Sequence, residues 1–212
     1  MKGPDVPLFV ICRDRFSCLV QLTDWLTGAG HTNIVLVDNA SSYPPLLEWY
    51  GRCGHSVVRL EENAGHRAPF ELGLVPTNLP YVVTDCDVVP DDDCPLDAVD
   101  HLLDLLLSYD VNKVGLGLVI DQLPATNMAR VAQDLEQRFW VAPLGPGILD
   151  APVDTTFAIY RPGLPFDVEG ARTAAPYVAR HLTWYLEPDD IPEDEQWYLD
   201  RKEGFTGYSG QY

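Results

Sequence analysis

The sequence predicts a single α/β domain with a mainly parallel central sheet and helices on both faces. The apolar runs at residues 8–12 and 34–37 have the pattern of strands that are buried on both faces, as in parallel sheets. A segment with helical periodicity separates them, and this order of strand, helix and strand is the βαβ unit, whose right-handed crossover makes the strands parallel. With 212 residues, of which 46% are hydrophobic, the chain is long enough for one sizeable core.

Strands and helices alternate along the first half of the chain. Leu19, Leu22 and Leu26 recur at helical spacing after the first strand, and Ser17 is placed to cap that helix. Further strands are expected at 34–37, 57–60 and 81–84, with short helices at 46–50 and 70–74 between them.

The second half of the chain is less regular. Asp92 and Asp93 suit the N-terminus of the next helix, because acidic side chains stabilise that end of the helix dipole. A strand is expected at 113–120, where Gly115 and Gly117 permit a bulge or a close backbone approach. A helix at 128–140 and a strand at 155–160 follow, and beyond them we expect an irregular C-terminal region.

Composition restricts the classes of partner. The formal net charge of −18 repels phosphate backbones, so extensive nonspecific nucleic-acid binding is not expected. No apolar run approaches the roughly 18 residues of a transmembrane helix, and the N-terminus leads directly into the first strand without the apolar stretch of a signal peptide. Five cysteines without a CxxC pair suit reduced thiols, so we expect a cytoplasmic protein.

Two carboxylates one residue apart, Asp85 and Asp87, follow the apolar strand at 81–84. Carboxylate oxygens are ligands for hard divalent cations, and this spacing lets both side chains reach one ion. The intervening Cys86 is expected in the core. The alternative is an ordinary turn, because Asp is common in turns and three more aspartates follow Pro90.

Polar side chains follow several strands at the point where each strand ends. Arg13 follows the first strand, Asp38 the second and Asp85 the fourth. Because open α/β sheets bind ligands at the carboxyl edge of their strands, we expect these residues to converge there. His66 and Arg67, in a glycine-containing loop, add positive polar groups that suit a phosphate or a sugar, although exposed charges in a connecting loop need no function.

Taken together, the strand before Arg13, the loop at 37–42, the Asn63-x-Gly65 loop and the Asp85-x-Asp87 motif resemble glycosyltransferases of the GT-A fold, particularly family-2-like bacterial members. The resemblance covers most of residues 1–120, which would be the nucleotide-sugar-binding part. Segments 151–162 and 180–185 resemble the same group and place the acceptor-side part and the tail in residues 121–212.

The resemblance implies a nucleotide-diphosphate sugar donor and a divalent cation, Mn²⁺ or Mg²⁺, held on the diphosphate by the DxD carboxylates. Asp87 would bind the metal most directly, Asp85 would contact metal or ribose, and His181 resembles a C-terminal metal-ligand histidine. Donor contacts are implied for the following residues: Arg13, Asp38, Asn63, Arg67 and Asp85.

Transfer with inversion requires a base that deprotonates the acceptor hydroxyl, and Asp154 is the first candidate. The competing role of Asp154 is to stabilise its own turn. Glu193, Asp194 and Glu195 are further carboxylates, although such a run is usually a solvated surface. The sequence lacks the Gln/Arg-x-x-Arg-Trp pattern of processive family-2 synthases, so we expect transfer of a single sugar.

The acceptor is not defined by the sequence: a glycan, a glycolipid, a protein or a modified nucleobase would each supply a hydroxyl. Two other functions remain open. A nucleotidyltransferase also uses paired carboxylates with a metal, but the loop at residues 12–15 lacks the glycines of its phosphate loop. A nucleotide-sugar-binding module without catalysis would have the same fold.

Overall fold

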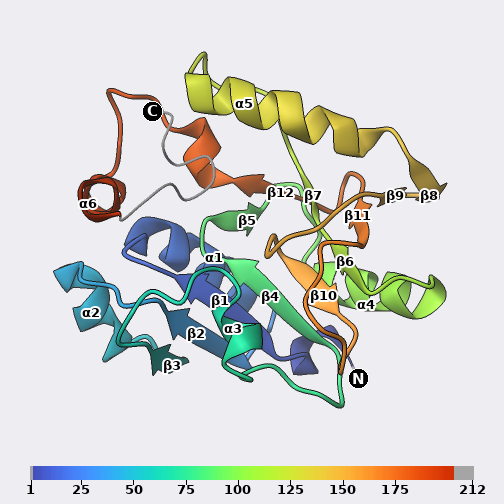
Figure 1. The fold of residues 1–212 in the computed structure, drawn as a ribbon, viewed down its shortest axis with the longest axis horizontal. Coiled ribbons are helices and arrows are strands. Elements are labelled where there is room, and N and C mark those ends of the chain that lie inside the picture. Colours follow the sequence, from blue (N-terminus) through green and yellow to red (C-terminus); the bar gives the residue numbers. More distant parts are fainter. Residues whose placement is uncertain (1, 203–212) are drawn as a thin grey trace.

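The computed structural model describes residues 2–202, which form a nine-stranded sheet and a smaller three-stranded sheet (Figure 1). The nine strands lie in the order β3-β2-β1-β4-β10-β6-β11-β9-β8, and the three strands in the order β5-β12-β7. The class is α/β, as the sequence predicts.

The parallel part of the large sheet comes from the first half of the chain. It contains β1 (Leu8–Cys12), β2 (Ile34–Asp38), β3 (Ser56–Arg59) and β4 (Tyr81–Asp85), all paired in parallel. The connections carry α1 (Phe16–Gly28), α2 (Pro44–Tyr50) and α3 (Ala68–Glu71). These strands confirm the predicted βαβ pattern, while α3 is a single turn that begins two residues before the predicted helix.

The prediction of a mainly parallel sheet is wrong, because the second half of the chain makes the sheet mixed. β10 (Ala158–Tyr160) lies antiparallel between β4 and β6 (Lys113–Gly115). β11 (Ala171–Thr173) is parallel to β6 but antiparallel to β9 (Ile148–Asp150), which is antiparallel to β8 (Pro143–Gly145). β8, β9, β10 and β11 follow one another through turns and loops, so the crossover helix that enforces parallel pairing is missing from these connections.

The strand predicted at 113–120 divides between the two sheets. β6 ends at Gly115 in the large sheet, and β7 (Gly117–Leu118) joins the small sheet with β5 (Val88–Pro90) and β12 (Val178–His181). Both glycines sit where the backbone approaches closely. A Cβ atom on Gly115 would lie 2.7 Å from Val153 Cγ1, and one on Gly117 would overlap the carbonyl oxygen of Thr173.

The core lies on both faces of the large sheet. Leu8 and Val10 of β1 point into a cluster that contains the apolar sides of α1 and α4 (Ala98–Ser108). Phe9 and Ile11 point the other way, into a cluster with Ala68 of α3. This alternation explains why β1 is a continuous apolar run, and it places helices on both faces, as expected.

Several predicted helix boundaries differ from the observed ones. α4 begins at Ala98, so Asp92 and Asp93 lie in the preceding turn rather than at a helix N-terminus. Ser17 lies inside α1 and therefore does not cap it. The predicted helix at 128–140 is α5 (Asn127–Glu136) followed by a 3-10 turn, Gln137–Trp140.

The C-terminal region holds more structure than expected. It contains β11, β12, a 3-10 turn at Leu182–Tyr185 and the helix α6 (Glu193–Arg201), and a further 3-10 turn, Gly3–Asp5, precedes β1. Figure 1 shows α6 beyond the ends of β1 and β4, on the side away from the N-terminus. None of the helices within residues 2–202 combines the length and apolar character needed to cross a bilayer.

Candidate active site

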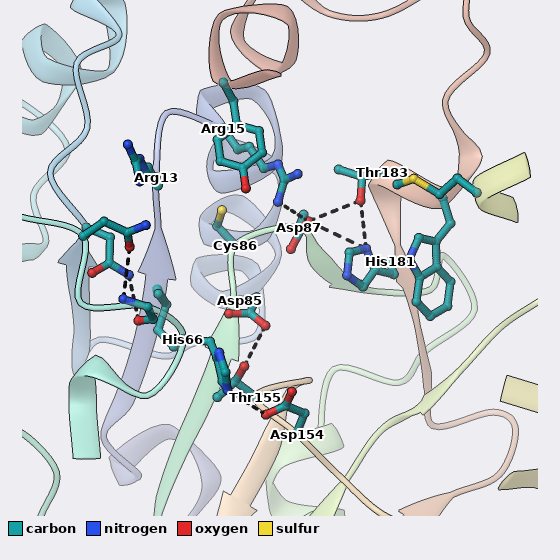
Figure 2. Close-up of a pocket in the computed structure, with 17 residues that line it drawn as sticks. Arg13, Arg15, His66, Asp85, Cys86, Asp87, Asp154, Thr155, His181 and Thr183 are labelled. Atoms are coloured by element: carbon teal, nitrogen blue, oxygen red, sulfur yellow. Dashed lines mark hydrogen bonds and ion pairs between the residues drawn. The ribbon is translucent and has the colours of Figure 1, made fainter. Parts of the chain in front are cut away.

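A cavity of about 490 Å³ opens at the carboxyl edge of β1 and β4. Side chains from both halves of the chain line it, and Figure 2 shows the polar ones converging on one space. The lining residues that the sequence predicts as functional are Arg13, Asn63, Asp85, Asp87, Asp154 and His181. The expected convergence of the strand ends is therefore seen for Arg13, Asp85 and Asp87, while the side chain of Asp38 is not part of the lining.

The sheet topology places Asp85, Asp87 and His181 together. β4 ends at Asp85, and a two-residue turn leads from it to β5. β12 pairs antiparallel with β5 so that His181 lies opposite Val88, and Leu182 N–H donates to the backbone oxygen of Asp87 at 2.8 Å. His181 Nδ1 therefore lies 3.7 Å from Asp87 Oδ2.

Asp87 is buried and already paired. Arg15 Nη1 lies 2.9 Å from Asp87 Oδ2, and the hydroxyl of Thr183 lies 3.4 Å from the same oxygen (Figure 2). Thr183 also contacts His181 Nδ1 at 3.0 Å, and the His181 ring stacks on Trp184 with centroids 4.5 Å apart. The imidazole is thus held in place on its ring face and at one nitrogen.

The pKa values of Asp85 and Asp87 are shifted in opposite directions. Burial raises the pKa of Asp85 well above its ordinary value, and the nearby charge of Asp87 raises it further. Burial also opposes ionisation of Asp87, but the charges of His181 and Arg15 outweigh it and lower the pKa of Asp87. Burial lowers the pKa of His181, and the neighbouring charge of Asp87 opposes this shift.

Asp85 is connected to Asp154 through Thr155. The Thr155 hydroxyl donates to Asp85 Oδ2 at 2.7 Å, and Asp85 N–H donates to the Thr155 carbonyl at 2.8 Å. The Asp154 side chain is 54% exposed and lies 3.5 Å from His66 Nε2. Asp154 therefore stands at the open side of the cavity, where a molecule entering from solvent can reach it.

Arg13 and Asn63 line the other side of the cavity. Arg13 lines the cavity, and its Nε is buried without a hydrogen-bond partner among residues 2–202. Asn63 belongs to a loop that Asn39 holds by accepting from Ala64 N–H and donating to the carbonyl of Gly65. Gly65 has a φ of 76°, which explains the glycine at this position.

Two of the predicted donor-binding residues lie outside the described lining of this cavity. Asp38 is fully buried, and its carboxylate contacts Arg59 Nε at 3.1 Å and the Tyr50 hydroxyl at 3.2 Å. Arg67 points to Glu71, with 2.8 Å between Arg67 Nη2 and Glu71 Oε1. In this structure the side chains of Asp38 and Arg67 thus pair with residues outside the lining of the cavity.

Sequence reasoning missed the part of the site that α6 contributes. Asp194 and Glu195 were expected on a solvated surface, but they are only 5% and 2% exposed. Glu195 binds Arg15, and Tyr198 lines the cavity. The signal available in the sequence was the pairing of an acidic helix start with apolar Trp197 and Tyr198, which is typical of a helix that docks rather than one that is solvated.

The donor set partly fits a divalent cation. Asp85, Asp87 and His181 line a single cavity, and carboxylate and imidazole groups are ligands that Mn²⁺ accepts. In the described part of the chain, however, no group of three or more His, Cys, Asp or Glu side chains is already arranged around one ion position. Asp85, Asp87 and His181 are the candidate ligands that this cavity offers.

All five cysteines are free thiols, and Cys86 is 3% exposed between the two carboxylates, as expected for a core residue. Comparison with protein-family models found no match, and no curated protein is significantly similar to the chain.

Proposed function

We propose that this protein is a metal-dependent glycosyltransferase that moves one sugar from a nucleotide-diphosphate sugar to an acceptor hydroxyl with inversion. The observation that supports it is the single cavity that brings Asp85, Asp87 and His181 together with Arg13 and Asp154 at the carboxyl edge of a parallel strand group. Each of these chemical groups has a place in such a transfer.

On the donor side, Arg13 offers an unpartnered guanidinium nitrogen, which is suited to a phosphate oxygen. Asp85, Asp87 and His181 are the proposed ligands of Mn²⁺ or Mg²⁺. When bound, the cation supplies positive charge that stabilises the departing nucleoside diphosphate.

On the acceptor side, Asp154 is the proposed base. It accepts the proton of the acceptor hydroxyl while the acceptor oxygen forms a bond to the anomeric carbon of the sugar. The bond between that carbon and the diphosphate oxygen breaks, and the nucleoside diphosphate leaves with the electron pair. His66, 3.5 Å from Asp154, is placed to stabilise the carboxylate when the imidazole is protonated.

A panel of nucleotide sugars with uracil, guanine and thymine bases tests the proposal, first by thermal shift and then by release of the nucleoside diphosphate, each with and without Mn²⁺. We expect one donor class to raise the melting temperature more with Mn²⁺ than without, because ligands that bind the native state stabilise it. Failure of the whole panel to bind or to turn over would exclude the transferase function.

Two variants make this assay specific. Asp87→Asn should reduce turnover by about 100-fold or more, because it removes the charge of the proposed main ligand. Asp93→Asn, an exposed aspartate six residues further along, should leave turnover unchanged. Full activity in Asp87→Asn would refute the metal role, and metal-dependent donor binding without hydrolysis or transfer would favour a non-catalytic binding module.

A further inference from the structure

Arg15 is fixed at the centre of an ionic network that joins the candidate metal site to α6. Its Nη1 lies 2.9 Å from Asp87 Oδ2, while its Nε and Nη2 lie 2.5 Å and 3.0 Å from the two oxygens of Glu195. Its guanidinium also stacks over the Tyr198 ring at 4.1 Å. The three charged side chains are at most 15% exposed, so solvent screens their interactions little.

This arrangement makes Arg15 a competitor of any cation at Asp87. The guanidinium occupies Oδ2, the same oxygen that Thr183 and His181 approach. A divalent ion on this carboxylate would either displace Arg15 or stand next to it. Both outcomes are unfavourable for the ion alone, since one breaks the buried ion pair between Arg15 and Asp87 and the other places like charges together.

A diphosphate removes this conflict. Its oxygens accept hydrogen bonds from a guanidinium in the same forked geometry as a carboxylate, and its negative charge offsets both cations. Arg15 lines the cavity beside Arg13, so a diphosphate bound there is within reach of its N–H groups while Glu195 keeps hold of the other side.

We propose that Arg15 is a binding residue that couples metal binding to diphosphate binding: its guanidinium pairs with Asp87 when neither ligand is bound and moves to the diphosphate when donor and cation bind together. The inference rests on the proposed function, because it takes a nucleotide diphosphate as the ligand. Coupling of this kind is reciprocal, so the diphosphate must raise the affinity for the metal by the same factor as the metal raises that for the diphosphate.

Calorimetric titration of Mn²⁺ into the full-length protein, alone and with UDP or GDP present, tests the coupling after subtraction of Mn²⁺ binding to the free nucleotide. For the wild type we expect weak Mn²⁺ binding alone and binding on the order of tenfold tighter with the matching diphosphate. Arg15→Gln should bind Mn²⁺ alone on the order of tenfold tighter than the wild type and should lose most of the gain from the diphosphate.

Three further variants isolate the charge of Arg15. Arg15→Lys keeps the positive charge and should retain weak binding of Mn²⁺ alone. The double variant Arg15→Gln, Glu195→Gln removes both charges of the Arg15–Glu195 pair, so it reports the same tightening if Arg15→Gln is poorly folded. Arg52→Gln removes an exposed arginine that pairs with Glu48, and it should behave as the wild type.

The possible outcomes separate this inference from the proposed function. The role of Arg15 is overturned if Arg15→Gln and the double variant Arg15→Gln, Glu195→Gln bind Mn²⁺ alone no more tightly than the wild type. It is also overturned if the diphosphate raises the Mn²⁺ affinity of these two variants as much as that of the wild type. Either result counts against Arg15 even if donor turnover is detected. Coupling that depends on Arg15 without transfer to any acceptor supports the inference and counts against the transferase. Absence of Mn²⁺ and diphosphate binding in every protein overturns both.

Discussion

Lys113 holds its ammonium group among aromatic rings on β6. Its Nζ donates to the carbonyl of Asp167 and lies 5.0 Å from the ring centre of Tyr160 and 4.6 Å from that of Phe166. The residue is 1% exposed, and burial lowers the pKa of its side chain to about 8. A charged group with a folded-state pKa below its unfolded value makes stability depend on pH.

The sign of this dependence follows from proton binding. Between about pH 8 and 10.4 the unfolded chain binds more protons at Lys113 than the folded chain, so this residue destabilises the fold below pH 8 and ceases to do so as the pH rises. The unfolding free energy of the wild type relative to Lys113→Met should therefore rise by about 1–3 kcal/mol from pH 7 to 10.

Urea denaturation at a series of pH values measures the unfolding free energy of both proteins. Subtracting one value from the other cancels the contribution of the tyrosines and cysteines that both proteins share. Lys2→Met, at an exposed position, serves as the control and should give a flat difference. A flat curve for Lys113→Met as well would show that the ammonium group is solvated in the folded protein.

At the residue scale, prediction from the sequence succeeded for the carboxylates at the end of β4 and failed for Asp38 at the end of β2, which does not line the cavity. Asp85 and Asp87 follow a recognisable buried strand, so their place at the sheet edge could be deduced. Arg15 and Glu195 are 180 residues apart, and their pairing depends on where α6 docks. Local patterns carry no information on such a long-range contact, which is why the ion pair between Arg15 and Glu195 was not foreseen.

At the scale of elements, α6 closes the N-terminal end of α1. Asp194 Oδ2 accepts hydrogen bonds from the Ser17 backbone N–H at 2.6 Å and from the Ser17 hydroxyl at 2.8 Å. Ser17 is the second residue of α1, so its N–H is one of those that a helix leaves without an internal partner. A residue from a distant helix therefore performs the capping that was expected of Ser17 itself.

Asp194→Ala should consequently lower the unfolding free energy by about 1–2 kcal/mol, the usual cost of losing a cap. Glu193→Ala changes the neighbouring exposed carboxylate and should stay within about 0.5 kcal/mol of the wild type. Urea denaturation followed by circular dichroism measures both. Equal effects of the two substitutions would mean that the general acidity of this turn matters and the hydrogen bonds to Ser17 do not.

At the scale of the whole molecule, the first half followed the sequence rules and the second half did not. The runs that form β1, β2 and β4 are long enough to show burial on both faces, and a helix of clear periodicity, α1, separates the first two. β8 to β11 have three residues each, which is too short to show a period or a direction. The antiparallel insertion of β10 between β4 and β6 is therefore a tertiary feature.

Substitution of Gly117 tests whether the two sheets unfold as one cooperative unit. The chain passes from β6 to β7 here, and a Cβ atom would overlap the Thr173 carbonyl oxygen and approach Trp140 Cη2 to 2.9 Å. Because the oxygen belongs to the backbone of β11, relief requires a shift between the sheets. Gly117→Ala should lower the unfolding free energy by about 1–3 kcal/mol.

Gly28→Ala is the matched control, because Gly28 ends α1 and no described atom outside its own helix lies within 4 Å of its Cβ position. This variant should be as stable as the wild type or up to about 1 kcal/mol more stable.

Urea transitions followed by tryptophan fluorescence and by far-ultraviolet circular dichroism should coincide in every variant, since a single domain unfolds in one step. If Gly117→Ala separated the two transitions, the small sheet that carries His181 would be an independent unit. The placement of His181 beside Asp87 would then depend on how two units dock, and the prediction of one domain would be wrong.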